Sequence, residues 1–141
     1  MSLKMIDEEL PSEIFHLATN CGNELGWRLE DVKYVVEIAK KNSLGIVGGQ
    51  VQFRFPGATC ELYWVNADPD PWNENDKWDE YIDRSYTQFI NLFDQNVASR
   101  DIIREGMDSF PIIVDKMKQG LNPFDYLYFL IYFTDKSDTE G

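Results

Sequence analysis

The sequence predicts an α+β fold, in which a small antiparallel sheet built on a central β-hairpin is packed by several helices. Residues 45–66, GIVGGQVQFRFPGATCELYWVN, alternate apolar and polar side chains on either side of a Pro-Gly pair, which is the pattern of a hairpin. The stretches before and after them repeat apolar residues at helical spacing. Because 141 residues is the usual size of one domain, we expect a single domain over residues 4–134 and a frayed tail at 135–141.

The composition is strongly acidic. The chain has 25 Asp and Glu residues against 13 Lys and Arg residues, a net charge of −12. This excess disfavours nucleic acid and anionic membranes, because both are bound through basic surfaces. It would instead attract a basic protein partner.

The sequence also bears on the compartment. We find no apolar signal segment and no apolar run of about 18 residues, so we expect neither a signal peptide nor a membrane span. Cys21 and Cys60 form no CxxC pair, which favours reduced thiols in a cytoplasmic protein over a Cys21–Cys60 bridge. Residues 1–3 and 140–141 resemble vector-derived ends.

Two helices are expected before the hairpin. Ser12 is a candidate N-cap for a short helix through Ala18 that ends at Gly22. Residues 28–41 form a clearer helix, with acidic residues in the first turn and lysines in the last. Its apolar stripe consists of Val32, Val35, Val36 and Ala39.

The hairpin has one apolar and one polar face. An L-proline cannot lead the usual two-residue hairpin turns, so we expect a four-residue loop, Pro56–Thr59. That loop fixes the register of the two strands. The expected apolar pairs are Phe55–Cys60, Phe53–Leu62 and Val51–Trp64, and the expected polar pairs are Arg54–Glu61 and Gln52–Tyr63.

A long helix is expected after the hairpin and its acidic loop, residues 66–77. Asp76 and Asp79 resemble a capping box at its start. We expect this helix, Trp78–Phe93, to cross the apolar face of the sheet. Its stripe consists of Trp78, Tyr81, Ile82, Ser85, Phe89, Leu92 and Phe93.

The C-terminal third is less regular. Ser99 is a candidate cap for a helix through Ile103, and Ser109 for one that ends at Gly120. Residues 122–133 are apolar almost throughout. We favour a buried helix there because Asn122-Pro123 is a good N-cap and N1 pair, with a central strand as the alternative.

No motif indicates catalysis, a metal or a cofactor. Gly45, Gly48 and Gly49 do not match a phosphate loop and are better explained by a bulge or a close approach to the backbone. The only histidine, His16, has no partner motif. The acidic loop lacks the central glycine and the regular spacing of a calcium site, and its candidate ligands are Asp68, Asp70, Glu74 and Asp76.

The candidate binding residues lie on the polar face of the hairpin and in the acidic loop. Gln52, Arg54, Glu61 and Tyr63 share the polar face, where Arg and Tyr are good anchors for a ligand or partner. An ordinary solvated sheet face with a cross-strand ion pair is the alternative. Trp72 lies in a polar loop, where it either contacts a partner or folds back onto the core.

Residues 27–64, WRLEDVKYVVEIAKKNSLGIVGGQVQFRFPGATCELYW, resemble small, acidic, uncharacterised bacterial proteins of the toxin-immunity type. The resemblance implies a bacterial cytosolic protein and transfers no functional residue. Together with the charge, it favours a non-enzymatic protein-binding domain, such as an immunity-type inhibitor of a basic effector. The alternative is a small-ligand module or enzyme that uses the polar face of the hairpin.

Overall fold

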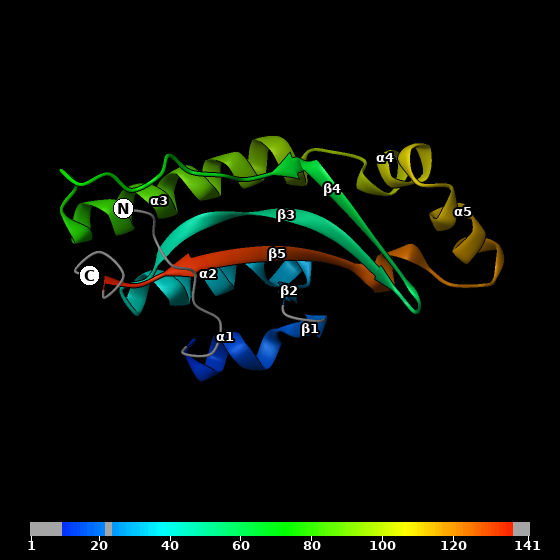
Figure 1. Cartoon of the computed structure of the whole chain (residues 1–141), viewed down its shortest axis with the longest axis horizontal. Helices are drawn as coiled ribbons and strands as arrows, with labels where there is room; N and C mark the ends of the chain where they lie inside the picture. Colours follow the sequence, from blue (N-terminus) through cyan, green and yellow to red (C-terminus); the bar gives the residue numbers. More distant parts are fainter. Residues whose placement is uncertain (1–9, 22–23, 137–141) are drawn as a thin grey trace.

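Strands from both ends of the chain meet in one antiparallel sheet with the order β1-β2-β5-β3-β4 (Figure 1). The computed structural model describes residues 10–21 and 24–136. Within them it contains five α-helices and five strands, which confirms the predicted α+β class. The predicted stop at Gly22 and the suggested vector-derived ends lie outside the described residues. The strands are β1 (Thr19–Cys21), β2 (Glu24–Trp27), β3 (Gly45–Phe55), β4 (Ala58–Asn66) and β5 (Leu127–Thr134).

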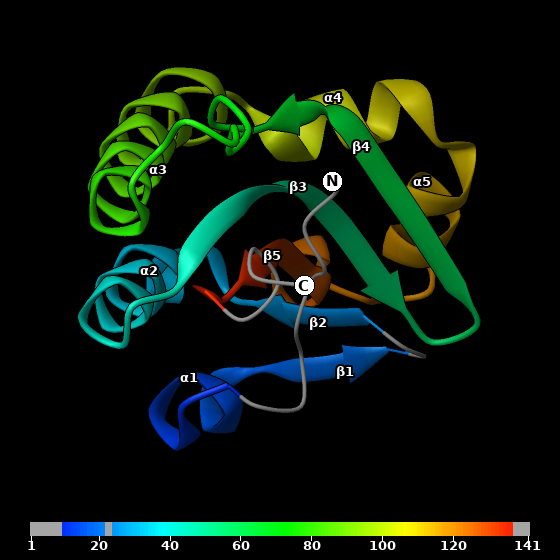
Figure 2. The same cartoon turned by 60° about the vertical axis from the view of Figure 1, so that its left-hand side comes forward.

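A layer of helices covers the apolar face of the sheet. In Figure 2, α3 (Trp78–Phe93), α2 (Val32–Lys41) and α1 (Ser12–Leu17) lie in a row along one face. The same view shows the twist of the sheet, since β4 runs steeply whereas β1 and β2 run nearly level. No helix within the described ranges is long and apolar enough to cross a membrane.

The hairpin register differs from the prediction by two residues. Phe55 pairs with Ala58, and Phe53 pairs with Cys60. The turn contains only Pro56 and Gly57, and Gly57 has a φ of 78°. A type II turn requires a positive φ at its third position, which glycine supplies, and commonly has proline at its second, so the four-residue loop is not needed. The shift is even, so it changes the pairs but keeps Phe53 and Cys60 on the apolar face.

A bulge in β4 overturns the predicted Val51–Trp64 pair. Val51 pairs with Leu62, and the residue before it, Gln50, pairs with Asn66. Residues 63–65 therefore have no partner on β3. The extra residues reverse the alternation of inward and outward side chains. Val65 is fully buried, whereas Trp64 is 41% exposed.

Residues 127–134 form the central strand β5 and not the helix that we favoured. Asn122 does act as an N-cap, since its side chain accepts a hydrogen bond from the amide of Phe124, but it caps only the 3₁₀ turn Pro123–Tyr126. β5 pairs with β2 on one side and β3 on the other. These non-local backbone bonds, together with side chains that favour strands, outweigh the local capping signal.

The two strongest helix predictions are confirmed. α2 follows a 3₁₀ turn, Leu29–Asp31, and buries the expected valines. α3 has the predicted bounds and crosses the apolar face, where Phe89 and Phe93 meet the ring of Phe129 edge-on at 6.0 and 5.3 Å. Its buried residues are Tyr81, Ile82, Ser85, Phe89 and Phe93.

The N-terminal region is only partly helical. α1 ends at Leu17, and its N-cap residue is Pro11 rather than Ser12. The chain then forms β1 and β2, which the sequence did not predict. Trp27 of β2 ties α1 to the sheet, because its indole Nε1 donates to the carbonyl of Ile14 at 2.9 Å.

Three shorter helical segments follow α3. A π-helical turn, Asp94–Ala98, extends it directly. α4 (Ile102–Ser109) is capped by Asp101 and not by Ser99, because the Asp101 side chain accepts from the amide of Arg104. α5 (Pro111–Lys118) starts after Phe110 rather than after Ser109. It ends as predicted at Gly120, which has a φ of 94°.

The glycines of β3 allow close packing against neighbouring groups. The pairing with β5 shifts between Ile46 and Gly48, which is the predicted bulge. A Cβ on Gly48 would overlap the carboxylate of Asp68. That carboxylate accepts a hydrogen bond from the amide of Gly49 at 3.2 Å, so a residue of the acidic loop binds the strand directly.

Candidate functional site

The polar face of the sheet is organised around Arg54, which is buried rather than solvated as expected. Its Nε donates to the side-chain oxygen of Gln52. Its Nη1 and Nη2 donate to the backbone carbonyls of Thr19, at 2.6 Å, and Glu24, at 3.0 Å. These two carbonyls belong to β1 and β2, so the Arg54 side chain links these two strands to β3.

The surroundings of Arg54 are shaped to receive it. A Cβ on Gly26 would lie 3.1 Å from the guanidinium carbon, so this position leaves room for the arginine head. The Tyr128 ring lies under the guanidinium, 5.6 Å from its centre. Burial lowers the pKa of Arg54, while nearby Cys21 and Glu24 act in the opposite direction. A guanidinium stays charged under such a shift, so Arg54 is a fixed cation with a structural role.

A second chain of hydrogen bonds crosses the same face. The hydroxyl of Tyr132 donates to Glu24 Oε2 at 2.7 Å and accepts from Gln50 Nε2 at 3.2 Å. Burial and the bond to Glu24 raise the pKa of Tyr132 well above its ordinary value, so the hydroxyl stays protonated. These groups satisfy one another's hydrogen bonds.

Of the four predicted face residues, only Tyr63 has a mostly exposed side chain. Gln52 is buried and donates from Nε2 to Glu61 Oε1 at 2.9 Å. Glu61 is half-buried and also bonds to the Tyr63 hydroxyl, which raises the pKa of Tyr63. Tyr63 itself is 65% exposed. The structure therefore brings the four residues together, but Gln52 and Arg54 are not available to a ligand.

Trp64 adds an exposed aromatic group, although the predicted register placed it on the apolar face. Its indole Nε1 donates to Glu105 Oε1 at 3.1 Å, and its ring stacks at 6.5 Å on Phe110. Arg100 Nη1 donates to the same carboxylate oxygen at 2.6 Å. The bulge in β4 places this ring outside the core. We call Glu61, Tyr63, Trp64 and Glu105 the β4 patch.

The acidic loop is tied to α3 rather than arranged around a cation. Asp76 does not form the predicted capping box, because the N-cap of α3 is Lys77. The Asp76 carboxylate instead accepts a hydrogen bond from Arg84 Nη2 at 3.0 Å. Gln88 and Asp70 bond to each other twice. Within the described ranges, no group of three or more His, Cys, Asp or Glu side chains could hold a metal ion.

The remaining predicted residues do not extend the polar face. Trp72 is half-buried, and no hydrogen bond or ring contact within the described chain links it to the other four candidates. Both cysteines are free thiols, so the alternative disulfide is not formed. Cys21 is exposed, whereas Cys60 is buried and its pKa is raised by burial.

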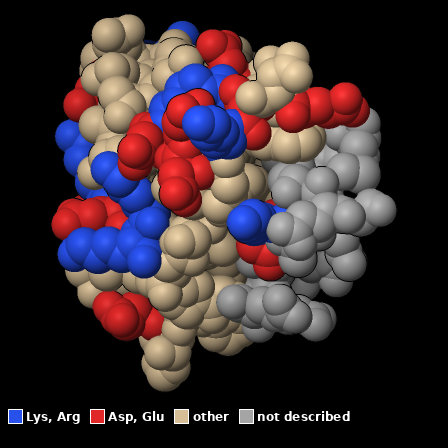
Figure 3. Space-filling view, turned by 90° about the vertical axis from the view of Figure 1, so that its left-hand side faces the viewer, with Lys and Arg blue, Asp and Glu red and all other residues tan. Residues whose placement is uncertain are grey.

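Both signs of charge occur together at one end of the molecule. Figure 3 shows one end of the molecule, where Lys and Arg side chains alternate with Asp and Glu. Ion pairs such as Arg84–Asp76, at 3.0 Å, and Lys40–Asp83, at 3.6 Å, are formed by α2, α3 and the acidic loop. A mixed surface of this kind attracts neither sign of charge strongly.

Comparisons with protein-family models, curated protein sequences and solved structures found no significant match to this chain.

Proposed function

We propose that this protein is a non-enzymatic binding domain that holds a basic protein partner on the β4 patch. The observation that carries the proposal is that two consecutive residues of the edge strand β4, Tyr63 and Trp64, have exposed aromatic rings, each hydrogen-bonded to a carboxylate. Tyr and Trp are favoured anchors at protein interfaces. Edge strands are also accessible to partners, because one side of their backbone is unpaired.

The charge around the rings indicates the kind of partner. Glu61 and Glu105 flank the two aromatic side chains and would meet Lys or Arg side chains at the rim of an interface. The net charge of −12 would speed the approach of a basic protein over longer distances. Arg100 bonds to Glu105 and offsets part of its charge, so the Glu61 carboxylate contributes more of this attraction.

An immunity-type role fits this arrangement. An acidic inhibitor can associate rapidly with a basic toxic enzyme and cover its cleft without any chemistry of its own. The resemblance of residues 27–64 to small bacterial immunity proteins supports the same role, in the cytoplasm of a bacterium. The opposing proposal, a ligand site on the polar hairpin face, is weakened because the donors of Arg54 already bind Gln52, Thr19 and Glu24.

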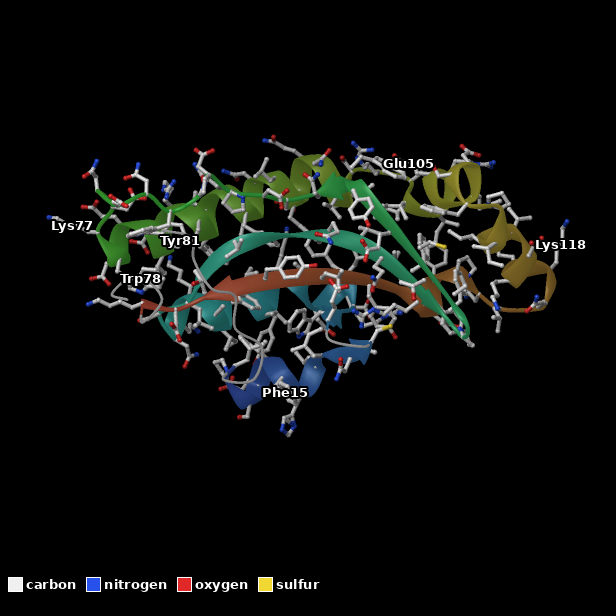
Figure 4. All side chains as sticks on the ribbon, in the orientation of Figure 1. Phe15, Lys77, Trp78, Tyr81, Glu105 and Lys118 are labelled. Carbon is white, nitrogen blue, oxygen red and sulfur yellow. The ribbon has the colours of Figure 1, made fainter. Side chains whose placement is uncertain are left out.

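Peptide selection tests the proposal before the partner itself is identified. The purified chain is used to select from a random peptide library, and the variants Tyr63→Ser and Trp64→Ser are used in parallel. Phe15→Ser is the matched control, because Phe15 is an aromatic residue with 48% exposure in α1. Figure 4 places Phe15 and Glu105 at opposite sides of the molecule.

We expect the wild-type chain to enrich peptides rich in Lys and Arg, with binding that weakens as salt rises. Both patch variants should lose this enrichment, and the Phe15 variant should keep it. Enrichment of neutral or acidic peptides would contradict the proposal. An equal loss of enrichment in the Phe15 variant would also contradict it, because peptide binding would then not depend specifically on the β4 patch.

A further inference from the structure

A cavity of about 540 Å³ opens between the end of α3 and the start of α4. Its volume lies within the range of small-molecule sites, about 300–1,000 Å³. The π-helical turn at residues 94–98 contributes to its wall, and such turns often occur at functional sites. None of the predicted face residues lines it. The larger apolar side chains of the lining are Leu29, Phe93, Val97, Ile102, Ile103, Phe124 and Leu127.

The deep side chains of this cavity are apolar and fixed by the fold. Phe93, Val97 and Leu127 are all buried in the core. Phe124, by contrast, is 59% exposed although it lines the same cavity. A large apolar side chain beside an apolar cavity adds to the surface that an apolar ligand could remove from water.

The polar groups at this cavity differ in how far they are already engaged. Arg100 donates to Asn96 and Glu105, and Asp101 caps α4. Glu30 extends into solvent, with its side chain 74% exposed. The ion pair between Arg28 and Glu30 is long, at 3.9 Å. Arg28 is therefore the cation in the lining that is best able to accept a new anionic partner.

We propose that this cavity binds a small amphipathic carboxylate. Its aliphatic or aromatic body would contact Phe93, Ile103 and Leu127, and its carboxylate would pair with Arg28. The guanidinium fork suits a carboxylate, because two parallel hydrogen bonds can form between them. Arg28 also lies over the Tyr128 ring, 5.4 Å from its centre, which limits the motion of its side chain. None of the four residues of the β4 patch lines this cavity, although Arg100, which lines it, bonds to Glu105.

Decanoate is a suitable probe, with decanol and decyltrimethylammonium as neutral and cationic analogues of equal chain length. Each is titrated below its micelle concentration into the full-length chain, and binding is followed by calorimetry and by the methyl NMR signals of Val97, Ile102 and Leu127. Arg28→Gln removes the proposed anion partner. Lys118→Gln is the matched control, because it also removes one positive charge, from an exposed residue of α5.

A third variant tests the cavity itself. Ala98 lines it from an exposed position, so Ala98→Trp should fill the space without disturbing the core. We expect one decanoate per chain, shifts at the three methyl groups, and loss of decanoate and decanol binding in Ala98→Trp. Arg28→Gln should weaken decanoate about tenfold or more and leave decanol unchanged, as a lost charged hydrogen bond would.

Three results would overturn the proposal. The first is saturable binding of decyltrimethylammonium as tight as that of decanoate. The second is an equal effect of Arg28→Gln and Lys118→Gln on decanoate, which would indicate general attraction by charge. The third is no methyl shift with any of the three probes. Circular dichroism of each variant confirms that it is folded before it is titrated.

Discussion

Replacing Arg54 tests whether the polar face holds the fold together. In Arg54→Met, the carbonyls of Thr19 and Glu24 and the oxygen of Gln52 lose a charged donor. Such hydrogen bonds contribute about 1.5–3 kcal/mol each, but methionine keeps part of the apolar contact and water can reach the β1 edge. We therefore expect the free energy of unfolding to fall by about 3 kcal/mol.

The loss should be measured by urea denaturation, followed by circular dichroism. Native-state hydrogen exchange should show the largest loss of protection in β1 and β2, because Arg54 attaches these strands to β3. Arg28→Met is the control. Arg28 also lies over the Tyr128 ring, but its ion pair with Glu30 is long and exposed, so its loss should cost under about 1 kcal/mol. A loss in Arg54→Met no larger than in Arg28→Met would refute the reasoning.

Three further predictions concern a buried glycine, the two cysteines and Tyr132. Gly45→Ala should destabilise the chain by about 2–3 kcal/mol in urea denaturation, because its Cβ would overlap the buried ring of Tyr81; no change would show that the ring can move. A thiol reagent should label Cys21 in the folded chain but Cys60 only after unfolding, and mass spectrometry of native and denatured samples would detect early labelling of Cys60. Folding raises the pKa of Tyr132, so its contribution to stability is present below about pH 10 and is lost as the pH rises further. Denaturation at increasing pH should therefore show a steeper alkaline loss in the wild type than in Tyr132→Phe, and equal slopes would contradict this.

The hairpin shows how far a sequence pattern can predict a sheet. Its period of two assigns side chains to faces, and those of Phe53 and Cys60 are confirmed. The register depends instead on the turn, and a type II Pro-Gly turn removes two residues from the loop. The β4 bulge depends on still more distant groups. Asn96, about thirty residues away, donates to the carbonyls of Trp64 and Asn66 and holds the bulge.

The error in β5 has a related cause. Asn122 is a true cap, so the local capping signal is correct. If residues 127–134 were helical, however, β2 and β3 would lack the strand that lies between them in the sheet. Backbone bonds on two sides and burial on two faces favour the strand, and neither is visible in a window of twelve residues. β1 and β2 escape prediction because each has only three or four residues, too few for a periodicity to be recognised.

The sequence correctly predicts which residues share the polar face of the hairpin, but not how deeply each of them is buried. Gln52 and Arg54 lie on β3, beside the central strand β5, and Arg54 reaches the carbonyls of β1 and β2; buried polar groups at such positions must find partners within the protein. Tyr63 lies in the edge strand, beyond these neighbours, and stays in solvent. Alternation along a strand assigns a side chain to a face, whereas the neighbouring strands determine its depth. A binding role therefore fits Tyr63 and the adjacent Trp64, and a structural role fits Arg54.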